Sequence, residues 1–376
     1  MEILDKIRIL GDAGKYDTCA SSSSNRKTTT NDRIGNAASA GICHSFTQNG
    51  RCVSLFKTLY SNSCIYDCKY CSNSTCAKKK SQKVSYTPEE LAKTFMSLYV
   101  RNYVEGLFLS SGIVKDPDKT TEDMLTTVQL LRDKYKFHGY IHFKVIPGVN
   151  KHLLKHASEF ADRMSVNLEA PNKSRLSEIS SNKDYKIDII RRQRWVKQFK
   201  LPAGQTTQYV VGGSDETDIE ILKRTRWEYE NVSLRRAYFS VFLPVRGTPF
   251  QNKTPEPLLR EHRLYNIDFM MRQYKIKLKE FSSIMQDGML PKDDPKLLLA
   301  KQTLTKPVDV NESSFEQLIR VPGIGPTSAN RILRLQKNKQ KITKYETLHS
   351  MGIVLKRAKP FIKVNGRAQT HLGRFV

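Results

Sequence analysis

The feature that most constrains the fold is a regular alternation of short apolar runs with amphipathic stretches. Six runs have the length and apolar content of buried strands: CVSLFKTLYS (52–61), GLFLSS (106–111), YIHFKVI (140–146), RMSVNLE (163–169), TTQYVV (206–211) and AYFSVFL (237–243). The stretches between them read as helices, and one opens with Thr87 as N-cap, Pro88 next and Glu90 placed to close a capping box. This alternation predicts a parallel sheet covered by helices, with ligands bound at the carboxyl ends of the strands.

Three of the seven cysteines follow the first predicted strand directly, in SNSCIYDCKYCSNS (61–74). Cys64, Cys68 and Cys71 have the spacing C-x3-C-x2-C, and three thiolates leave one coordination position open at a metal centre. The chain has no apolar run of membrane-spanning length and no secretory leader, so we expect a cytoplasmic location and reduced, metal-binding thiols. An alternative stays open, in which Cys76 completes a four-thiolate zinc site. The other cysteines have no assigned role: Cys19, Cys43 and Cys52.

The charge of the chain indicates a polyanionic partner. Lys and Arg number 63 against 37 Asp and Glu, which gives a net charge of +26. Residues 301–376 hold 15 basic and 4 acidic side chains, a net +11, at roughly three times the charge density of the first 300 residues. Nucleic acid is the usual partner of so basic a segment, although a solvated lysine-rich surface explains the charge equally well.

The basic segment contains FEQLIRVPGIGPTSANRIL (315–333), the pattern of a helix-hairpin-helix motif. Gly323, Ile324 and Gly325 form its turn, and Thr327 starts the second helix. Two glycines allow a sharp turn that leaves backbone N–H groups pointing outward near a helix N-terminus, where a phosphate oxygen binds without base specificity. The sequence therefore predicts contacts with the DNA backbone at these residues. A helical cap that packs on the larger domain is the alternative.

A weaker second hairpin follows in LHSMGIVLKRAKPFI (348–362). It has one glycine of the pair, Gly352, and a basic group of which Lys356 and Arg357 are the predicted DNA contacts. Paired with the first motif, it indicates a unit of two hairpins.

The cysteine triplet, with Tyr70 before its last cysteine and a strand directly before it, resembles the signature of radical S-adenosylmethionine (SAM) enzymes. The resemblance implies a [4Fe–4S] cluster on Cys64, Cys68 and Cys71, with SAM on the fourth iron. It implies an electron donor such as flavodoxin or ferredoxin, and a 5′-deoxyadenosyl radical that abstracts hydrogen from an unreactive C–H bond. The difficult chemistry belongs to the cofactor, while the protein positions the reactants and excludes water.

The same resemblance implies cofactor contacts at the ends of the predicted strands: Tyr70, Ser110, Ser111, Gly112, Asn167, Glu169 and Gly212. The serine pair and Gly112 stand where relatives have a Gly-Gly-Glu-like turn, and the acidic residue is missing. Asn167 and Glu169 suit polar groups of ribose or methionine, or a satisfied core network. Gly212 lets adenine approach the backbone, or serves a plain tight turn. Lys144 points into the barrel or at the substrate.

Over roughly residues 1–365 the chain resembles a family of bacterial radical SAM proteins described as DNA modification or repair proteins. The matching stretches are GICHSFTQNGRCVSL, CIYDCKYC, EGLFLSSGIV, TTQYVVGGSDETD, FSVFLPVRGTPF, VPGIGPTSAN and GIVLKRAKPFI. The resemblance implies DNA as partner, a nucleoid association and a uracil-DNA-glycosylase-like protein as a second partner. We expect a single-stranded, damaged or flipped nucleotide as substrate, because a base inside a duplex is hard to reach. A radical SAM enzyme that modifies RNA and a non-catalytic iron–sulfur DNA-binding protein are the two alternatives.

The fold class that we expect is α/β, with an incomplete (β/α)6 barrel of the TIM type and a small all-α helix-hairpin-helix domain at the C-terminus. A chain of 376 residues suits one large domain and one small one. The predicted boundaries are an N-terminal extension at 1–50, the partial barrel at 51–290 and the DNA-binding module at 291–376. Within the extension, a helical start precedes a polar low-complexity stretch at 21–32.

Overall fold

The computed structural model describes residues 1–14, 42–46, 52–78 and 82–368. The chain divides into two compact units. Unit 1 comprises Met1–Glu216 and Lys223–Leu258, and unit 2 comprises Thr217–Leu222 and Leu259–Val376. The low-complexity stretch at 21–32 lies outside the described residues, as does Cys19. The predicted boundaries at residues 50 and 290 stay a prediction.

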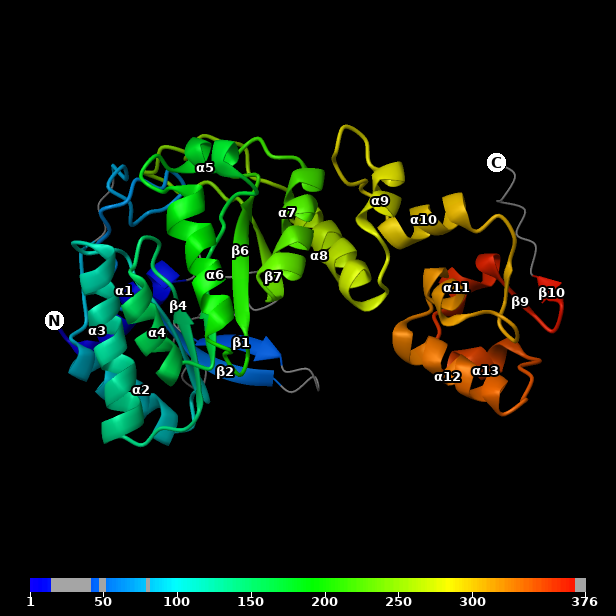
Figure 1. Ribbon diagram of the computed structural model, residues 1–376, viewed down its shortest axis with the longest axis horizontal. Helices are drawn as coiled ribbons and strands as arrows, with labels where there is room; N and C mark the ends of the chain where they lie inside the picture. Colours follow the sequence, from blue (N-terminus) through cyan, green and yellow to red (C-terminus); the bar gives the residue numbers. More distant parts are fainter. Residues whose placement is uncertain (15–41, 47–51, 79–81, 369–376) are drawn as a thin grey trace, which may run out of the picture. The chain divides into compact units, whose positions relative to one another are not determined.

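Unit 1 is built on a seven-stranded sheet with its strands in sequence order (Figure 1). The strands are β1 (Ile42–Phe46), β2 (Cys52–Leu59), β3 (Gly106–Ser110), β4 (Tyr140–Lys144), β5 (Arg163–Ser165), β6 (Gln205–Val211) and β7 (Leu234–Val241). β1 pairs antiparallel with β2, and every later pair is parallel. β1 and β7 form the two edges of the curled sheet. The predicted incomplete barrel is thus confirmed, with β1 as a seventh strand that the sequence analysis did not predict.

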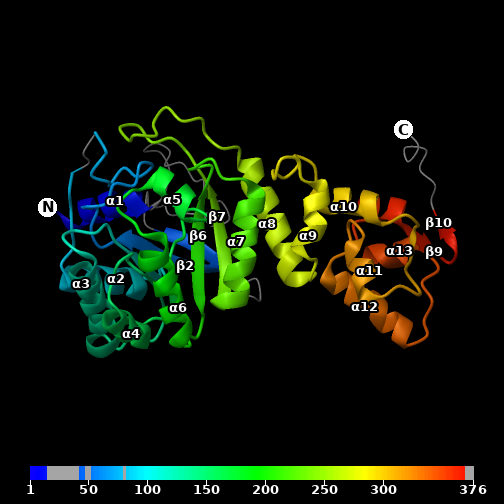
Figure 2. The same ribbon diagram turned by 45° about the horizontal axis from the view of Figure 1, so that its top comes forward.

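The connections between the parallel strands are mainly helical. The helices of this part are α1 (Ile3–Gly14), α2 (Pro88–Val100), α3 (Pro117–Gln129), α4 (Lys151–Phe160), α5 (Lys173–Ile179), α6 (Arg191–Gln198) and α7 (Asp218–Asn231), of which residues 218–222 belong to unit 2. Figures 1 and 2 both show α2, α3, α4 and α6 on the same side of the sheet. The capping box predicted at the start of α2 is confirmed, since Thr87 and Glu90 each accept the other's backbone N–H.

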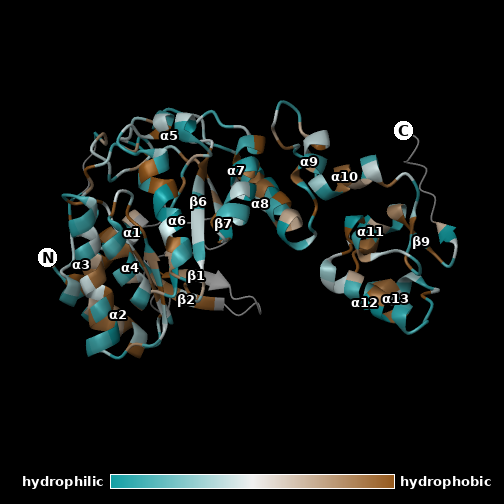
Figure 3. Ribbon diagram, in the orientation of Figure 1, coloured by the Kyte–Doolittle hydropathy of each residue, from teal (hydrophilic) through white to brown (hydrophobic). Residues whose placement is uncertain are grey.

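The core of unit 1 lies between these helices and the strands. Phe56 on β2, Leu107 on β3, Phe143 on β4 and Phe239 on β7 are all buried. Figure 3 shows hydrophobic and hydrophilic residues sharing helices such as α2, as expected for helices with one face on a core. Burial of these large side chains supplies most of the free energy that holds the sheet and helices together, and so fixes the strand ends that carry the site.

Unit 2 is mostly helical. Its helices are α8 (Leu258–Gln273), α9 (Leu278–Phe281), α10 (Pro295–Thr303), α11 (Phe315–Arg320), α12 (Pro326–Lys337), α13 (Tyr345–Ser350) and α14 (Leu355–Ala358). It also has a small sheet that the sequence analysis did not predict, of β8 (Val308–Asp309), β9 (Ile362–Val364) and β10 (Arg367–Ala368). Val310, Leu318, Val321, Ile332 and Ile362 belong to its separate buried core. None of the helices in the described part of the chain is long and apolar enough to cross a membrane.

Candidate functional site

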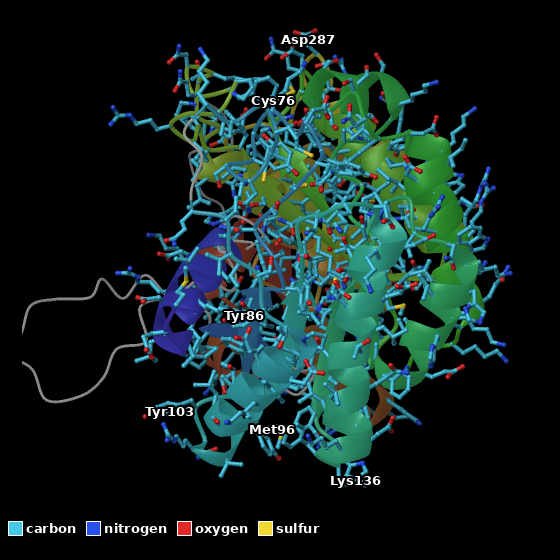
Figure 4. The ribbon with its side chains drawn as sticks, turned by 90° about the vertical axis from the view of Figure 1, so that its left-hand side faces the viewer. Cys76, Tyr86, Met96, Tyr103, Lys136 and Asp287 are labelled. Atoms are coloured by element: carbon cyan, nitrogen blue, oxygen red, sulfur yellow. The ribbon has the colours of Figure 1, made fainter. Side chains whose placement is uncertain are left out.

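A cavity of about 140 Å³ lies in unit 1 at the carboxyl ends of the parallel strands. Figure 4 shows which end of the strands this is. Tyr103 and Lys136 precede β3 and β4, and they lie at the end of the unit opposite Cys76 of the cysteine loop. The cavity is lined by most of the predicted site residues: Cys64, Cys68, Cys71, Tyr70, Ser110, Ser111, Gly112, Asn167 and Glu169. Residues that are scattered over 106 positions of sequence therefore meet at one place.

Of the described residues predicted to touch the cofactor, only Gly212 does not line this cavity. Gly212 has a φ of +79°, and a Cβ atom added to it would lie 2.4 Å from the carboxylate of Glu256. Lys144, the predicted inward-facing residue of β4, is part of the lining. The strand ends thus supply polar side chains to the cavity, while Gly212 serves a turn beside it.

Two of the three thiols accept hydrogen bonds from the backbone of their own loop. The N–H of Tyr66 donates to Cys64 Sγ at 3.5 Å, and the N–H of Asn73 donates to Cys71 Sγ at 3.4 Å. Cys68 is 8% exposed. Burial raises the pKa of Cys68 and raises that of Cys71 to about 12, so both are protonated thiols near neutral pH until a metal displaces the proton.

The cavity lining includes three thiols, the number that leaves one iron of a [4Fe–4S] cluster without a protein ligand. In the described part of the chain, no three or more His, Cys, Asp or Glu side chains are arranged to hold one metal ion. Thiolates of a [4Fe–4S] cluster bind different irons and need not converge on one point. Cys76, the fourth thiol of the zinc alternative, is exposed, and it does not belong to the cavity lining. The donor set of the cavity therefore fits a cluster with three thiolate ligands.

The turn after β3 is joined to the cysteine loop by backbone contacts. The N–H of Gly112 donates to the carbonyl of Ser61 at 2.7 Å, and the N–H of Ile65 donates to the carbonyl of Ile113 at 2.9 Å. A Cβ atom on Gly112 would lie 2.3 Å from the carbonyl oxygen of Ser63. The loop that carries Cys64 thus lies directly on a glycine, which explains why this turn has no larger residue there.

Glu169 adopts a backbone conformation that is rare outside glycine, with a φ of +62°. Its N–H donates to Gln208 at 3.0 Å and its carbonyl accepts from Val210 at 2.8 Å, so pairing with β6 maintains this conformation. Strained residues of this kind gather at functional sites, where the surrounding structure holds them. Here the conformation accompanies a buried carboxylate in the cavity lining.

Lys183 is a cavity residue that the sequence analysis missed. Its side chain is 7% exposed, and its Nζ lies 3.8 Å from Glu169 Oε1 and 5.9 Å from the centre of the Tyr66 ring. Burial alone lowers the pKa of Lys183, but the thiolate of Cys68, which forms when a metal displaces its proton, and the carboxylate of Glu169 outweigh burial and raise the pKa above its usual value. Lys183 is therefore a buried cation. The polar run around it, SSNKDY, carries no signal of this position.

Asp67, inside the cysteine motif, fixes the segment that leads to Lys183. Its carboxylate accepts the Ser180 hydroxyl at 2.5 Å and the Ser181 N–H at 2.9 Å. Burial alone would raise the pKa of Asp67, but these hydrogen bonds lower it to about 2. The carboxylate is thus charged near neutral pH and couples the cysteine loop to the segment that positions Lys183.

The hairpin of unit 2 has one packed side and one open side. The N–H of Val354 donates to the carbonyl of Gly323 at 3.1 Å, and a Cβ on Gly323 would lie 2.5 Å from the Val354 carbonyl oxygen. Gly323, with a φ of +86°, therefore packs the first hairpin against the second. Ile324 is buried, so only its backbone is accessible.

The open side of the hairpin is at Gly325, the N-cap of α12. No side chain within the described residues caps this helix, and a Cβ on Gly325 would meet none of their atoms within 4 Å. Thr327 is exposed on the first turn of α12, and Lys356 and Arg357 are exposed on α14. The predicted phosphate contacts thus include an uncapped helix N-terminus with its positive dipole end open to solvent.

Comparison with known proteins assigns two parts of the chain. The model of the radical SAM superfamily matches residues 58–227, and that of the helix-hairpin-helix motif matches residues 305–353. No curated protein matches the chain by sequence.

Similar solved structures include methylornithine synthase (PylB), with 17% identity and a TM-score of 0.46 over 57% of this chain and 60% of that one. The [FeFe]-hydrogenase maturase HydG has 12% identity and a TM-score of 0.47 over 57% and 48% of the two chains. The coproporphyrinogen III oxidase HemN from Escherichia coli has 14% identity and a TM-score of 0.38 over 62% and 55%. This chain thus spans about half to three fifths of the length of these proteins.

The family matches agree with the geometry, because residues 58–227 contain the cysteine loop together with every other residue that lines the cavity except Ala13. Residues 58–227 form a radical SAM domain, the domain of enzymes that use a [4Fe–4S] cluster and S-adenosylmethionine, and a helix-hairpin-helix motif follows it in the same chain.

Proposed function

We propose that this radical SAM enzyme modifies or repairs DNA and holds the phosphate backbone with its helix-hairpin-helix unit. The observation that carries the proposal is the presence of both parts in one chain, with the hairpin open at the uncapped N-terminus of α12. The net charge of +11 between residues 301 and 376 favours a polyanionic substrate. Backbone contacts of this kind tolerate any base sequence, so the reaction itself selects the nucleotide.

Cys64, Cys68 and Cys71 would hold the cluster, and the polar residues of the cavity would hold SAM. When bound, these groups supply a 5′-deoxyadenosyl radical that abstracts hydrogen from an unreactive C–H bond. The backbone N–H groups of Tyr66 and Asn73 orient the thiolates and lower the charge density on sulfur. An electron donor of the flavodoxin or ferredoxin type and a uracil-DNA-glycosylase-like protein are the proposed protein partners.

Lys183 and Glu169 would place opposite charges against the amino-acid part of SAM. That part has an ammonium and a carboxylate, and the cavity offers a buried cation 3.8 Å from a buried carboxylate. Asn167 and Gln208, which also line the cavity, add amide groups for hydroxyl recognition. Burial strengthens each of these charge-assisted hydrogen bonds, since the local dielectric constant is low.

Lys183→Met is expected to raise the dissociation constant (Kd) for SAM by about tenfold to a hundredfold, the range for loss of a hydrogen bond to a charged group. Equilibrium dialysis of the anaerobic, cluster-loaded protein measures this Kd, and the iron–sulfur absorbance reports whether the cluster is still present.

Lys186→Met is the matched control, because Lys186 is exposed three residues away and does not line the cavity. It should leave both the Kd and the absorbance unchanged. A Lys183→Met protein that binds SAM as tightly as the wild type would contradict the role given to Lys183.

The proposed function is tested by anaerobic reduction of the cluster-loaded protein with SAM and with DNA or RNA oligonucleotides of the same sequence. We expect DNA to stimulate the release of 5′-deoxyadenosine and to gain a mass change on one nucleotide. If RNA stimulates this release and DNA does not, the protein is an RNA-modifying enzyme instead. If the protein binds DNA but cleaves no SAM with either polymer, the result would contradict the proposal and favour a non-catalytic DNA-binding protein.

A further inference from the structure

A second cavity, of about 240 Å³, lies within unit 2 beside the open side of the hairpin. Its lining includes Phe269 and Tyr274 from α8 and the turn after it, Lys296 from α10, the hairpin at Gly325, and Arg357 from α14. The residues of the lining, which combine aromatic rings with cations, indicate what kind of group this cavity binds. It is separate from the cysteine-lined cavity, with which it shares no residue.

The lining has the chemistry of a stacking site. Phe269 is 44% exposed, and its ring meets Tyr274 edge to face at 5.5 Å between centroids and 77° between planes. Tyr274 supports Phe269 from one side, which leaves the exposed part of the Phe269 ring for another planar group. An exposed phenylalanine costs solvation free energy unless a ligand covers it, and nucleobases stack on such rings.

Two cations and one carboxylate set the charge of the cavity. Lys296 Nζ lies 4.5 Å from the centre of the Tyr274 ring and donates to the carbonyl of Ile324 at 2.6 Å, so it holds the hairpin in place. Arg357 is paired with Asp294 at 2.6 Å. When Lys296 is protonated, the sum is one net positive charge next to the uncapped N-terminus of α12, which favours an anionic ligand at this edge of the cavity.

We propose that this cavity binds one unpaired base of single-stranded DNA, stacked on Phe269, while the hairpin at Gly325 binds the adjacent phosphate. The inference rests on the proposed function and names its substrate class. A duplex keeps its bases stacked inside the helix and offers only phosphates to the hairpin. The site therefore makes unit 2 prefer single strands, which are also the form in which a base is open to chemical attack.

The test uses the full-length protein and three fluorescent oligonucleotides of one sequence: a single strand, a duplex and a single strand of abasic sites. The wild type is expected to bind the single strand about tenfold more tightly than the abasic strand, the order of magnitude for one base stacked on an aromatic ring. Phe269→Leu keeps an apolar side chain without the aromatic face. It should lose this preference and retain the wild-type affinity for duplex and abasic strands.

Tyr103→Leu is the matched control, because Tyr103 is 48% exposed on unit 1, at the end that Figure 4 shows opposite Cys76. It should behave as the wild type. If Phe269→Leu binds all three oligonucleotides as the wild type does, the base site is wrong while DNA binding stands. If the wild type binds none of the three, the proposed function and this inference both fail.

A second readout follows from Lys296. Burial, assisted by the charge of Arg357 and opposed by Asp294, lowers the pKa of Lys296 to about 7. A phosphate favours the protonated amine, so the Kd for the single strand should rise between about pH 6 and about pH 8 as Lys296 loses its proton. Lys296→Gln should remove this pH dependence. If the pH dependence persists in Lys296→Gln, the phosphate does not bind at the hairpin beside Lys296, and this part of the proposal is wrong.

Discussion

The Cys68→Ala variant is expected to lose the iron–sulfur charge-transfer absorbance and all SAM cleavage. Cys68 is the most buried thiol of the triplet and lies between the other two in sequence, so its loss leaves two protein ligands in a cavity that fits three. Cluster assembly needs every thiolate, whereas the DNA contacts that we propose belong to unit 2. The affinity for single-stranded DNA should therefore stay within about twofold of the wild-type value, as for independent sites that share no residue.

Cys76→Ala is the control for this prediction, since Cys76 is exposed and outside the cavity lining. It should keep the absorbance, the iron content and the SAM cleavage of the wild type. A Cys76→Ala protein that loses its metal, together with zinc in place of iron in the wild type, would establish the closed four-thiolate site instead. Loss of DNA affinity in Cys68→Ala would contradict the separation of the two functions.

The parallel strands could be predicted because each one lies in a short run that contains buried residues and stands between amphipathic helices. Burial favours apolar and β-branched residues in such strands, and this local pattern does not depend on the partner strand. β1 has no comparable signal. Ile42–Phe46 is short and contains Cys43 and His44, and it becomes a strand because it pairs with β2, from Phe46 opposite Cys52 to Ile42 opposite Phe56. The two-residue strands of unit 2 depend on tertiary pairing in the same way.

The residues of the candidate site also fall into two groups, those that a local sequence pattern predicts and those that only tertiary packing brings to the site. The cysteine spacing and the glycines of the hairpin are patterns within a few residues, and they can be read directly. Lys183 enters the cavity because Asp67, 116 residues earlier, holds the Ser180–Ser181 segment. Phe269 belongs to the hairpin site because unit 2 folds α8 beside it. Contacts between residues so far apart in sequence depend on packing, which no local pattern records.

The hairpin shows how one pattern can serve two purposes. Its two glycines are equivalent in the sequence motif, but Gly323 accommodates the backbone of Val354, while Gly325 faces open space. Only the second position is free to approach a phosphate. Sequence alone predicts that both glycines are needed, and the structure indicates that they are needed for different reasons.

Gly112→Ala is expected to displace the cysteine loop and to prevent most of the protein from loading a cluster. The added Cβ would lie 2.3 Å from the carbonyl oxygen of Ser63 and 3.2 Å from Cys64 Cβ, and the nearest atom belongs to backbone that cannot rotate away. The loop cannot move freely, because hydrogen bonds from Gly112 to Ser61 and from Ile65 to Ile113 hold it on both sides of the clash. Overpacking of this kind costs about 1–3 kcal/mol of unfolding free energy.

That cost corresponds to a decrease of roughly 3–10 °C in the melting temperature (Tm) of a domain of this size. Calorimetry and the iron content per chain measure both effects. Gly325→Ala is the matched glycine control, since its new methyl group meets none of the described atoms within 4 Å, and it should load iron as the wild type does. Because Cys64 is the thiol nearest to Gly112, a Gly112→Ala protein with full iron content and unchanged Tm would mean that this turn does not position the cluster ligand.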